Sequence, residues 1–237
     1  MRTGDWRHAG KRPTVERMNA PTKHASSDAT YLEEPLLIPA ILHEHDLPGP
    51  LTLNRLGSHG QLERLDQTTG YWHEHAATLY GRAMIAANIL PYPSVACADT
   101  ALWIWIGGDF PNTIDILTTS HHRTTKYGRP LRSHKRKTIR NDITTIGMLR
   151  VTSPTRTACD IAYTLHQQPG MPDPIDRIIA LMDAYGFTTE DCLDILNHNP
   201  YNSANPQAFA FFNRIRARRG GMEHGGVMQH GGAEQRR

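Results

Sequence analysis

Hydrophobic residues recur at different spacings along the chain, and each spacing predicts a different element. Over residues 34–45 the apolar side chains share one helical face, and the LPGP stretch at 47–50 breaks that helix. Three leucines predict a short second helix over residues 51–57. Apolar and polar residues then alternate, and a turn is expected at Gly70. This pattern predicts a β-hairpin. This order of helix, short helix and hairpin is typical of a small winged helix.

Helical and strand patterns alternate in the next part of the chain. Helical spacing covers residues 75–90 and ends at two prolines, and Ser94 is expected to cap a further helix that stops at Gly107. Stretches rich in β-branched residues predict strands at residues 113–119, 130–134 and 142–152.

Helix-start signals dominate the remaining sequence. Cap–proline pairs at residues 153–154 and 173–174 each predict a helix, and Gly186 is expected to end the second one. A capping box at residues 188–191 predicts another helix. The last helix is expected over residues 206–219.

Together these elements predict the α+β class, with a winged-helix-like head followed by an α/β domain whose C-terminal part is helical. We expect four parts, namely a disordered segment at 1–31, the head at 32–73, the second domain at 74–219 and a disordered Gly-rich tail at 220–237.

Charge is spread unevenly along the 237 residues, although the formal net charge is only +3. Residues 121–140 hold eight Lys and Arg and no Asp or Glu, a block that would attract phosphate. The alternative is a solvated loop without a partner. Residues 31–70 hold two basic and six acidic residues, which is an unfavourable field for approaching DNA.

Several classes of protein are disfavoured by what the sequence lacks. No apolar run is long enough to span a bilayer, and the basic N-terminus lacks the apolar stretch of a signal peptide, so we expect a cytoplasmic protein without membrane contact. The three cysteines form no CxxC pair and are expected to be core residues. The His-Glu-His triplets at 43–45 and 73–75 are expected to be surface histidines, because positions i and i+2 do not share a helical face. We expect no catalytic residue, no metal site and no cofactor.

Two groups of residues carry side chains suited to nucleic-acid contact. The head offers a short helix for a major groove, with nearby polar residues for phosphates or base edges. Its candidates are Thr52, Asn54, Arg55, His59, Gln61 and Arg64. The basic segment supplies the second group, Arg123, Lys126, Arg129, Arg132, Lys135, Arg136, Lys137 and Arg140. A nuclease is an alternative because Asp115 precedes this segment on a predicted strand, but the sequence lacks the Glu-x-Lys that would complete such a site.

A family resemblance follows from the order of four segments, GQLERLDQTTGYW, VACADTALWIWIGG, TIDILTT and GMLRVTSPTRTACDIA. In this order the chain resembles the AbiEi-like antitoxins of type IV toxin–antitoxin systems, actinobacterial members in particular, over roughly residues 35–218. The likeness is carried best by the family-motif residues Thr152, Pro154, Arg156, Thr157 and Asp160. From spacing alone, Arg156 and Asp160 are expected to form a surface ion pair one helical turn apart.

The resemblance implies an N-terminal winged helix-turn-helix joined to a C-terminal antitoxin domain, without an appended nuclease-like domain. It implies a transcriptional regulator that binds the DNA of its own operator and counteracts a nucleotidyltransferase toxin without stable contact. The positive face of the C-terminal domain would serve both roles, and the basic segment would supply it. The short acidic head departs from a well-formed winged helix, so a protein-interaction module that has lost DNA binding is a further alternative.

These expectations give a first test. We predict that the protein binds its own upstream DNA in a gel-shift titration, more weakly as salt rises, because phosphate contacts release counterions. Replacing Arg132, Lys135, Arg136 and Lys137 by Ala should abolish binding. Unchanged affinity in that variant would remove the segment from the binding surface.

Overall fold

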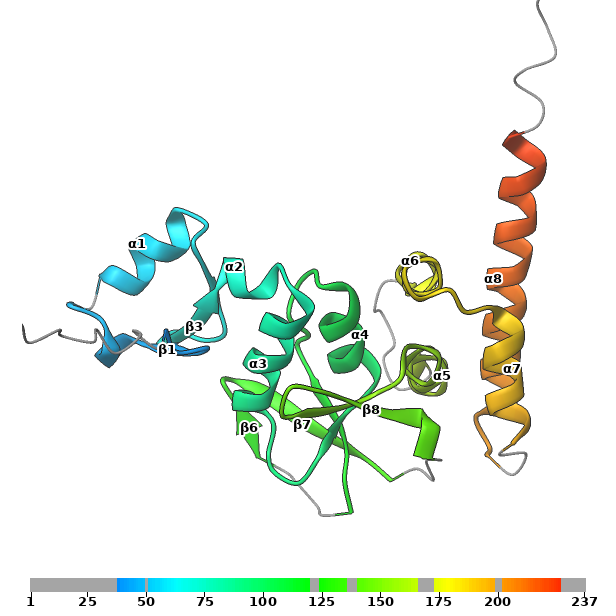
Figure 1. Ribbon diagram of the computed structural model, residues 1–237, viewed down its shortest axis with the longest axis horizontal. Helices are drawn as coiled ribbons and strands as arrows, with labels where there is room; N and C mark the ends of the chain where they lie inside the picture. The colour runs from blue at the N-terminus through cyan, green and yellow to red at the C-terminus, as the bar shows by residue number, and fades with distance from the viewer. Residues whose placement is uncertain are drawn as a thin grey trace, which may run out of the picture. The chain divides into compact units, whose positions relative to one another are not determined.

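The computed structural model describes residues 38–49, 51–119, 124–135, 140–165, 173–198 and 202–226 (Figure 1). In these residues the chain has eight α-helices and two sheets, as the predicted α+β class requires. None of the described helices is long and apolar enough to cross a membrane. The expectations for residues 1–31 and 227–237 fall outside the described residues.

The first sheet belongs to the region predicted as the head. Its elements are β1 (Leu42–His43), the 3₁₀ helix η1 (Glu44–Asp46), α1 (Thr52–Ser58), β2 (Leu62–Arg64) and β3 (Thr69–Trp72). The strands pair antiparallel in the order β1-β3-β2. The short helix and the hairpin are thereby confirmed.

Two details of this region were predicted wrongly. Residues 38–43 are not helical: Pro39 cannot donate a helical hydrogen bond, and Leu42 pairs with Gly70 as a strand. Gly70 itself lies inside β3, where it pairs with Leu42 and Arg64. A glycine is needed there because a Cβ would collide with the Leu62 side chain. The turn lies before it, where the Asp66 carboxylate accepts a hydrogen bond from the Thr68 amide at 2.9 Å.

The two faces of this small sheet join different cores. Leu42, Leu53 and Leu62 form a cluster of their own beneath α1. Tyr71, on the opposite face, packs against Trp103 and Phe110 with ring centroids 5.9 and 6.2 Å away. The β-hairpin is therefore anchored in the main core, whereas α1 is held by three leucines.

The second sheet has six strands and mixed direction. Its region contains α2 (His73–Ala76), α3 (Leu79–Ile89), β4 (Val95–Ala96), α4 (Ala98–Ile106), β5 (Ile114–Leu117), β6 (Thr125–Lys126), β7 (Arg129–His134), η2 (Arg140–Asp142), β8 (Ile143–Ile146) and β9 (Leu149–Thr152). The strand order is β6-β7-β5-β4-β9-β8, with β5 parallel to β7 and β4 parallel to β9. All three predicted strand regions are confirmed, and residues 142–152 form a hairpin of two strands.

One boundary in this region differs from the prediction. Ser94 does not cap a helix, because the next two residues form β4 and the Ser94 hydroxyl donates to the Pro91 carbonyl at 2.5 Å. Cys97 occupies the N-cap of α4 instead. The apolar run after Ser94 is read equally well as strand or helix, and pairing with β5 and β9 decides for a strand.

Four helices complete the described chain, namely α5 (Pro154–Thr164), α6 (Ile175–Tyr185), α7 (Thr189–Asn197) and α8 (Asn205–Gly226). The predicted cap at Ser153, the stop at Gly186 and the capping box at Thr188 are all confirmed. A disordered tail was expected from Gly220 onward. This expectation is wrong for residues 220–226, because α8 continues to Gly226. Extending a helix that is already docked avoids the unfavourable free energy of nucleation, because each added residue also adds a hydrogen bond.

All three cysteines are buried, as predicted. The Cys159 thiol on α5 lies 3.5 Å from the Cys192 carbonyl on α7, where it can donate a weak hydrogen bond. Burial raises the pKa of the Cys159 thiol, and the neighbouring Cys192 raises it further. These thiols are therefore packing groups between helices.

The family-motif segment forms the corner between β9 and α5, and its ion pair is buried. Arg156 Nε lies 3.1 Å from Asp160 Oδ1, and its Nη1 lies 2.8 Å from Asp142 Oδ2. The expectation of a surface pair is therefore wrong, because Asp142 from η2 and the packing around α5 enclose the guanidinium. Burial opposes the charge of Arg156, but the carboxylates of Asp160 and Asp142 outweigh it and raise its pKa.

This corner gives a stability prediction. Arg156→Met should lower the free energy of unfolding by about 3–5 kcal/mol, because it removes the buried guanidinium that two buried carboxylates share. Urea denaturation measures the loss. The matched control is Arg150→Met on the exposed side of β9, expected to change stability by no more than about 0.5 kcal/mol. Equal effects of the two substitutions would contradict a structural role for the buried guanidinium.

Candidate nucleic-acid interface

The candidates on the head divide into bracing and exposed residues. Arg64 Nη1 donates to Asn54 Oδ1 at 2.6 Å, Arg64 Nε donates to the Asp66 carbonyl at 3.0 Å, and the same guanidinium binds the Gln67 carbonyl. Arg64 therefore ties α1 to the β2–β3 turn. Thr52 is half-buried at the start of α1. Asn54 is exposed although it braces Arg64, and the other exposed candidates are Arg55, His59 and Gln61, in the last turn of α1 and just after it.

The β2–β3 turn is held by its own side chains. Asp66 accepts hydrogen bonds from the Thr69 hydroxyl at 2.6 Å and from the Thr68 amide. Partial burial disfavours the charged carboxylate, but these hydrogen bonds outweigh it and lower the pKa of Asp66. Asp66 thus stays ionised and keeps the turn closed.

This turn meets the β6–β7 hairpin, and we name the contact between Leu65, Tyr127 and Arg129 the hairpin junction. The Arg129 guanidinium binds the Leu65 carbonyl and lies 5.3 Å from the centre of the Phe110 ring. Burial lowers the pKa of Arg129, although the charge stays favoured. The Tyr127 ring lies 6.3 Å from that of His43 on β1. The structure thereby joins two regions that the sequence treats as separate.

The tip of the β6–β7 hairpin has the backbone of a tight two-residue turn. Tyr127 has a φ of 51° and Gly128 a φ of 70°, the left-handed values that a type I′ hairpin needs at both central positions. A bulky aromatic residue pays a steric cost in this conformation. Its contact with His43 is one interaction that offsets this cost.

The basic segment does not present one uniform cationic face in the described residues. Lys126 and Lys135 are exposed, whereas Arg129 and Arg132 turn toward the protein. Arg123, Arg136 and Lys137 lie outside the described residues, and Arg140 is described only as the start of η2.

Asp115 explains why Arg132 turns inward. Its carboxylate is fully buried and receives Arg132 Nε at 2.5 Å and Arg132 Nη2 at 2.9 Å, with His134 Nε2 at 2.7 Å. Burial opposes the charge of Arg132, but Asp115 outweighs it and raises the pKa of Arg132. Sequence reasoning missed this pair because the acid lies outside the segment. The parallel pairing of β5 with β7 brings Asp115 opposite Arg132.

The nuclease alternative finds no support in this geometry. A fully buried carboxylate whose oxygens are taken by Arg132 and His134 is poorly placed to hold Mg²⁺ or activate water. No group of three His, Cys, Asp or Glu residues among the described ranges is arranged to hold a metal ion.

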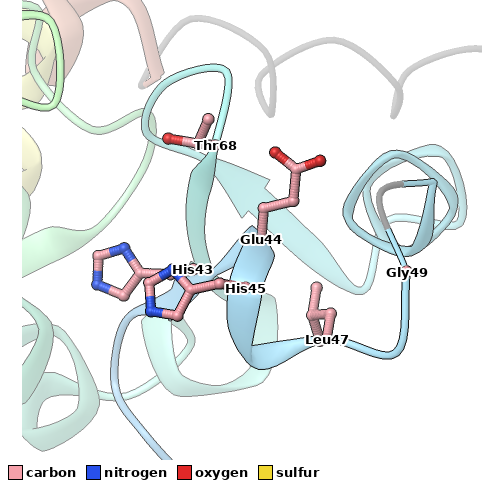
Figure 2. Close-up of a pocket in the computed structure, with 6 residues that line it drawn as sticks. All are labelled: His43, Glu44, His45, Leu47, Gly49 and Thr68. Carbon is pink, nitrogen blue, oxygen red and sulfur yellow. The ribbon is translucent and has the colours of Figure 1, made fainter.

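The first His-Glu-His triplet lines a cavity of about 510 Å³, shown in Figure 2. The rings of His43 and His45 are stacked, with centroids 5.1 Å apart and planes inclined by 15°. In the second triplet, the exposed His73 places Nδ1 3.1 Å from Glu63 Oε1. His45 and His73 are thus exposed, whereas His43 and His75 are half-buried. His43 contacts Tyr127 of the hairpin junction, and His73 lines a pocket together with Arg129.

Comparison with known proteins assigns the chain to no family. Neither the protein-family models nor the curated proteins contain a match to this sequence.

Substitution of Asp115 tests its structural role. Asp115→Asn should lower the free energy of unfolding by roughly 3 kcal/mol, because the substitution removes the closer of the two carboxylates that face Arg132 and leaves only Asp99, 3.9 Å away. Urea denaturation tests this, with the exposed Asp109→Asn as the control. Mg²⁺-dependent cleavage of DNA or RNA that is lost in a fully stable Asp115→Asn protein would reverse the assignment.

The same contacts change the choice of substitutions for DNA binding. Replacing Arg132 would unfold or loosen β7 as well as remove a charge, so a loss of binding in that variant has two explanations. Substitutions at exposed residues of the segment keep the Asp115 cluster intact.

Proposed function

We propose that the chain is an AbiEi-like transcriptional regulator that binds duplex DNA, its own operator above all, and that it has no catalytic activity of its own. The observation that carries this proposal is the hairpin junction, which sets the exposed end of α1, the β2–β3 turn and Lys126 on connected elements. Winged helices contact DNA with a helix that is followed by a β-hairpin.

Helix α1 is the element that we assign to the major groove. Arg55 is its exposed cation, and His59 and Gln61 follow at its C-terminal end. Arginine can donate two hydrogen bonds to a guanine edge, which makes Arg55 the residue for sequence preference. The brace between Arg64 and Asn54 fixes α1 before DNA arrives and so reduces the entropic cost of binding.

Lys126 and Lys135 are assigned to phosphate. Both are exposed at the ends of the β6–β7 region, and Lys126 directly precedes the hairpin turn that touches the head. Phosphate contacts of this kind position a protein on DNA without selecting a sequence. They also compensate for the acidic residues of the head, which alone would repel the duplex.

The antitoxin part of the proposal rests on the sequence resemblance. A nucleotidyltransferase gene beside this one, whose toxicity is relieved when both are expressed, would support it. We assign no cofactor and no stable toxin complex to the chain.

The DNA-binding part is tested by fluorescence anisotropy with the upstream duplex and a scrambled duplex at several salt concentrations. Arg55→Ala should cut the preference for the upstream duplex about tenfold, because a base contact is lost. Lys126→Ala should weaken binding to both duplexes equally and reduce the salt slope by about 1. Arg150→Ala, an exposed arginine of β9, is the control for the loss of one positive charge.

Two results would exclude this function. One is the absence of any duplex binding by the unmodified protein. The other is an equal, small effect of all three substitutions, since binding would then depend on overall charge and not on the joined elements.

A further inference from the structure

The cavity beside the hairpin junction has a lining suited to a flat ligand. It is formed by His43, Glu44, His45, Leu47, Gly49 and Thr68 (Figure 2). The His45 side chain is 80% exposed, although one face of its ring lies against His43. The other face is therefore open to solvent and available for stacking.

The ring pair is held in place before any ligand binds. The backbone amide of Glu44 donates to the Thr68 carbonyl at 2.8 Å, and that of His43 donates to Asp46 Oδ2 at 2.9 Å. The ring of Tyr127 supports His43 from the β6–β7 hairpin. A prearranged aromatic surface loses little side-chain entropy on binding, which favours affinity.

The charges at this cavity disfavour phosphate and favour an uncharged base. Glu44 and Asp46 both carry carboxylates here, and a phosphate placed among them would be repelled. Aromatic side chains are the usual stacking partners of unpaired bases in nucleic-acid-binding proteins. Lys126 is exposed and directly precedes Tyr127, whose ring contacts His43. We assign it to the phosphate that follows a bound base.

Glu44 decides which base fits. Glu44 is half-buried, and its carboxylate has no side-chain partner among the described residues. A carboxylate accepts two hydrogen bonds side by side, and guanine offers two adjacent N–H donors on its Watson–Crick edge. Adenine offers one donor beside an acceptor, which a carboxylate leaves unmatched.

We propose that this cavity binds an unpaired guanine base, which stacks on the open face of His45 and donates two hydrogen bonds to Glu44. This site rests on the proposed function in that the chain must bind nucleic acid, yet it uses residues other than those of α1. The guanine can belong to a single strand or to a free nucleotide, since the chemistry of the base is the same.

The test uses labelled oligothymidine strands that contain one central guanine, one central adenine or thymine alone, with binding followed by anisotropy. The full chain should bind the guanine strand about tenfold more tightly than the thymine strand. His45→Ala should remove most of this difference, and His45→Tyr should keep the affinity because a ring remains. Tyr80→Ala, which removes an exposed ring on α3, is the matched control and should change nothing.

Glu44→Gln separates hydrogen bonding from charge. Losing a negative charge should strengthen binding of every strand to a similar degree, whereas the ratio of guanine to adenine affinity should fall toward one. Thermal unfolding of each variant shows whether the head is still folded. Equal affinity for the three strands, or equal losses in His45→Ala and Tyr80→Ala, would overturn the site.

Two further measurements distinguish a free nucleotide from a single strand as the source of the guanine, and the guanine site from the proposed duplex binding. Displacement of the guanine strand by GMP but not AMP supports recognition of the free nucleotide, and strand preference without displacement supports a strand. Guanine preference in a protein that ignores duplex DNA keeps this site and rejects the proposed function. Duplex binding with equal affinity for the three single strands keeps the proposed function and rejects the guanine site.

Discussion

A buried carboxylate holds one arginine of the basic segment against the protein. Asp115 is fully enclosed, and an enclosed charge is tolerated only with a close counter-charge and satisfied hydrogen bonds. Arg132 and His134 meet this demand from the neighbouring parallel strand. The cost is that a run of cations which looks continuous in sequence is divided in space. Arg132 is structural, whereas Lys126 and Lys135 are exposed.

Local signals in the sequence predicted most elements, whereas contacts between distant segments escaped it. Ser153, Gly186 and Thr188 cap their helices as expected because capping depends on neighbouring residues alone. Burial of the Arg156 pair and the inward turn of Arg132 depend on Asp142 and Asp115, which come from other strands or turns. Single-sequence periodicity carries no information on which strand becomes a neighbour, so these partners could not be predicted.

The candidate interface shows the same division. Exposed residues at the end of α1 were expected from the polar positions of a short helix, and Arg55 is exposed in the structure. The joining of the head to the β6–β7 hairpin was not expected, since Leu65 and Arg129 are 64 positions apart. One arginine brings these two segments together. The head is thereby given a neighbour whose charge opposes its own acidity.

Four arginines in the middle of α8 add a consequence for ionic strength. Arg214, Arg216, Arg218 and Arg219 pair with Asp173, Glu190, Asp176 and Asp183 of the segments beside them, all at the surface. Phe211, Phe212 and Ile215 attach this part of α8 by apolar packing, and the exposed ion pairs lie on the same turns. Added salt therefore has two targets, the proposed nucleic-acid surface and this part of α8. A loss of affinity at high salt reports on DNA alone only if helix content stays constant.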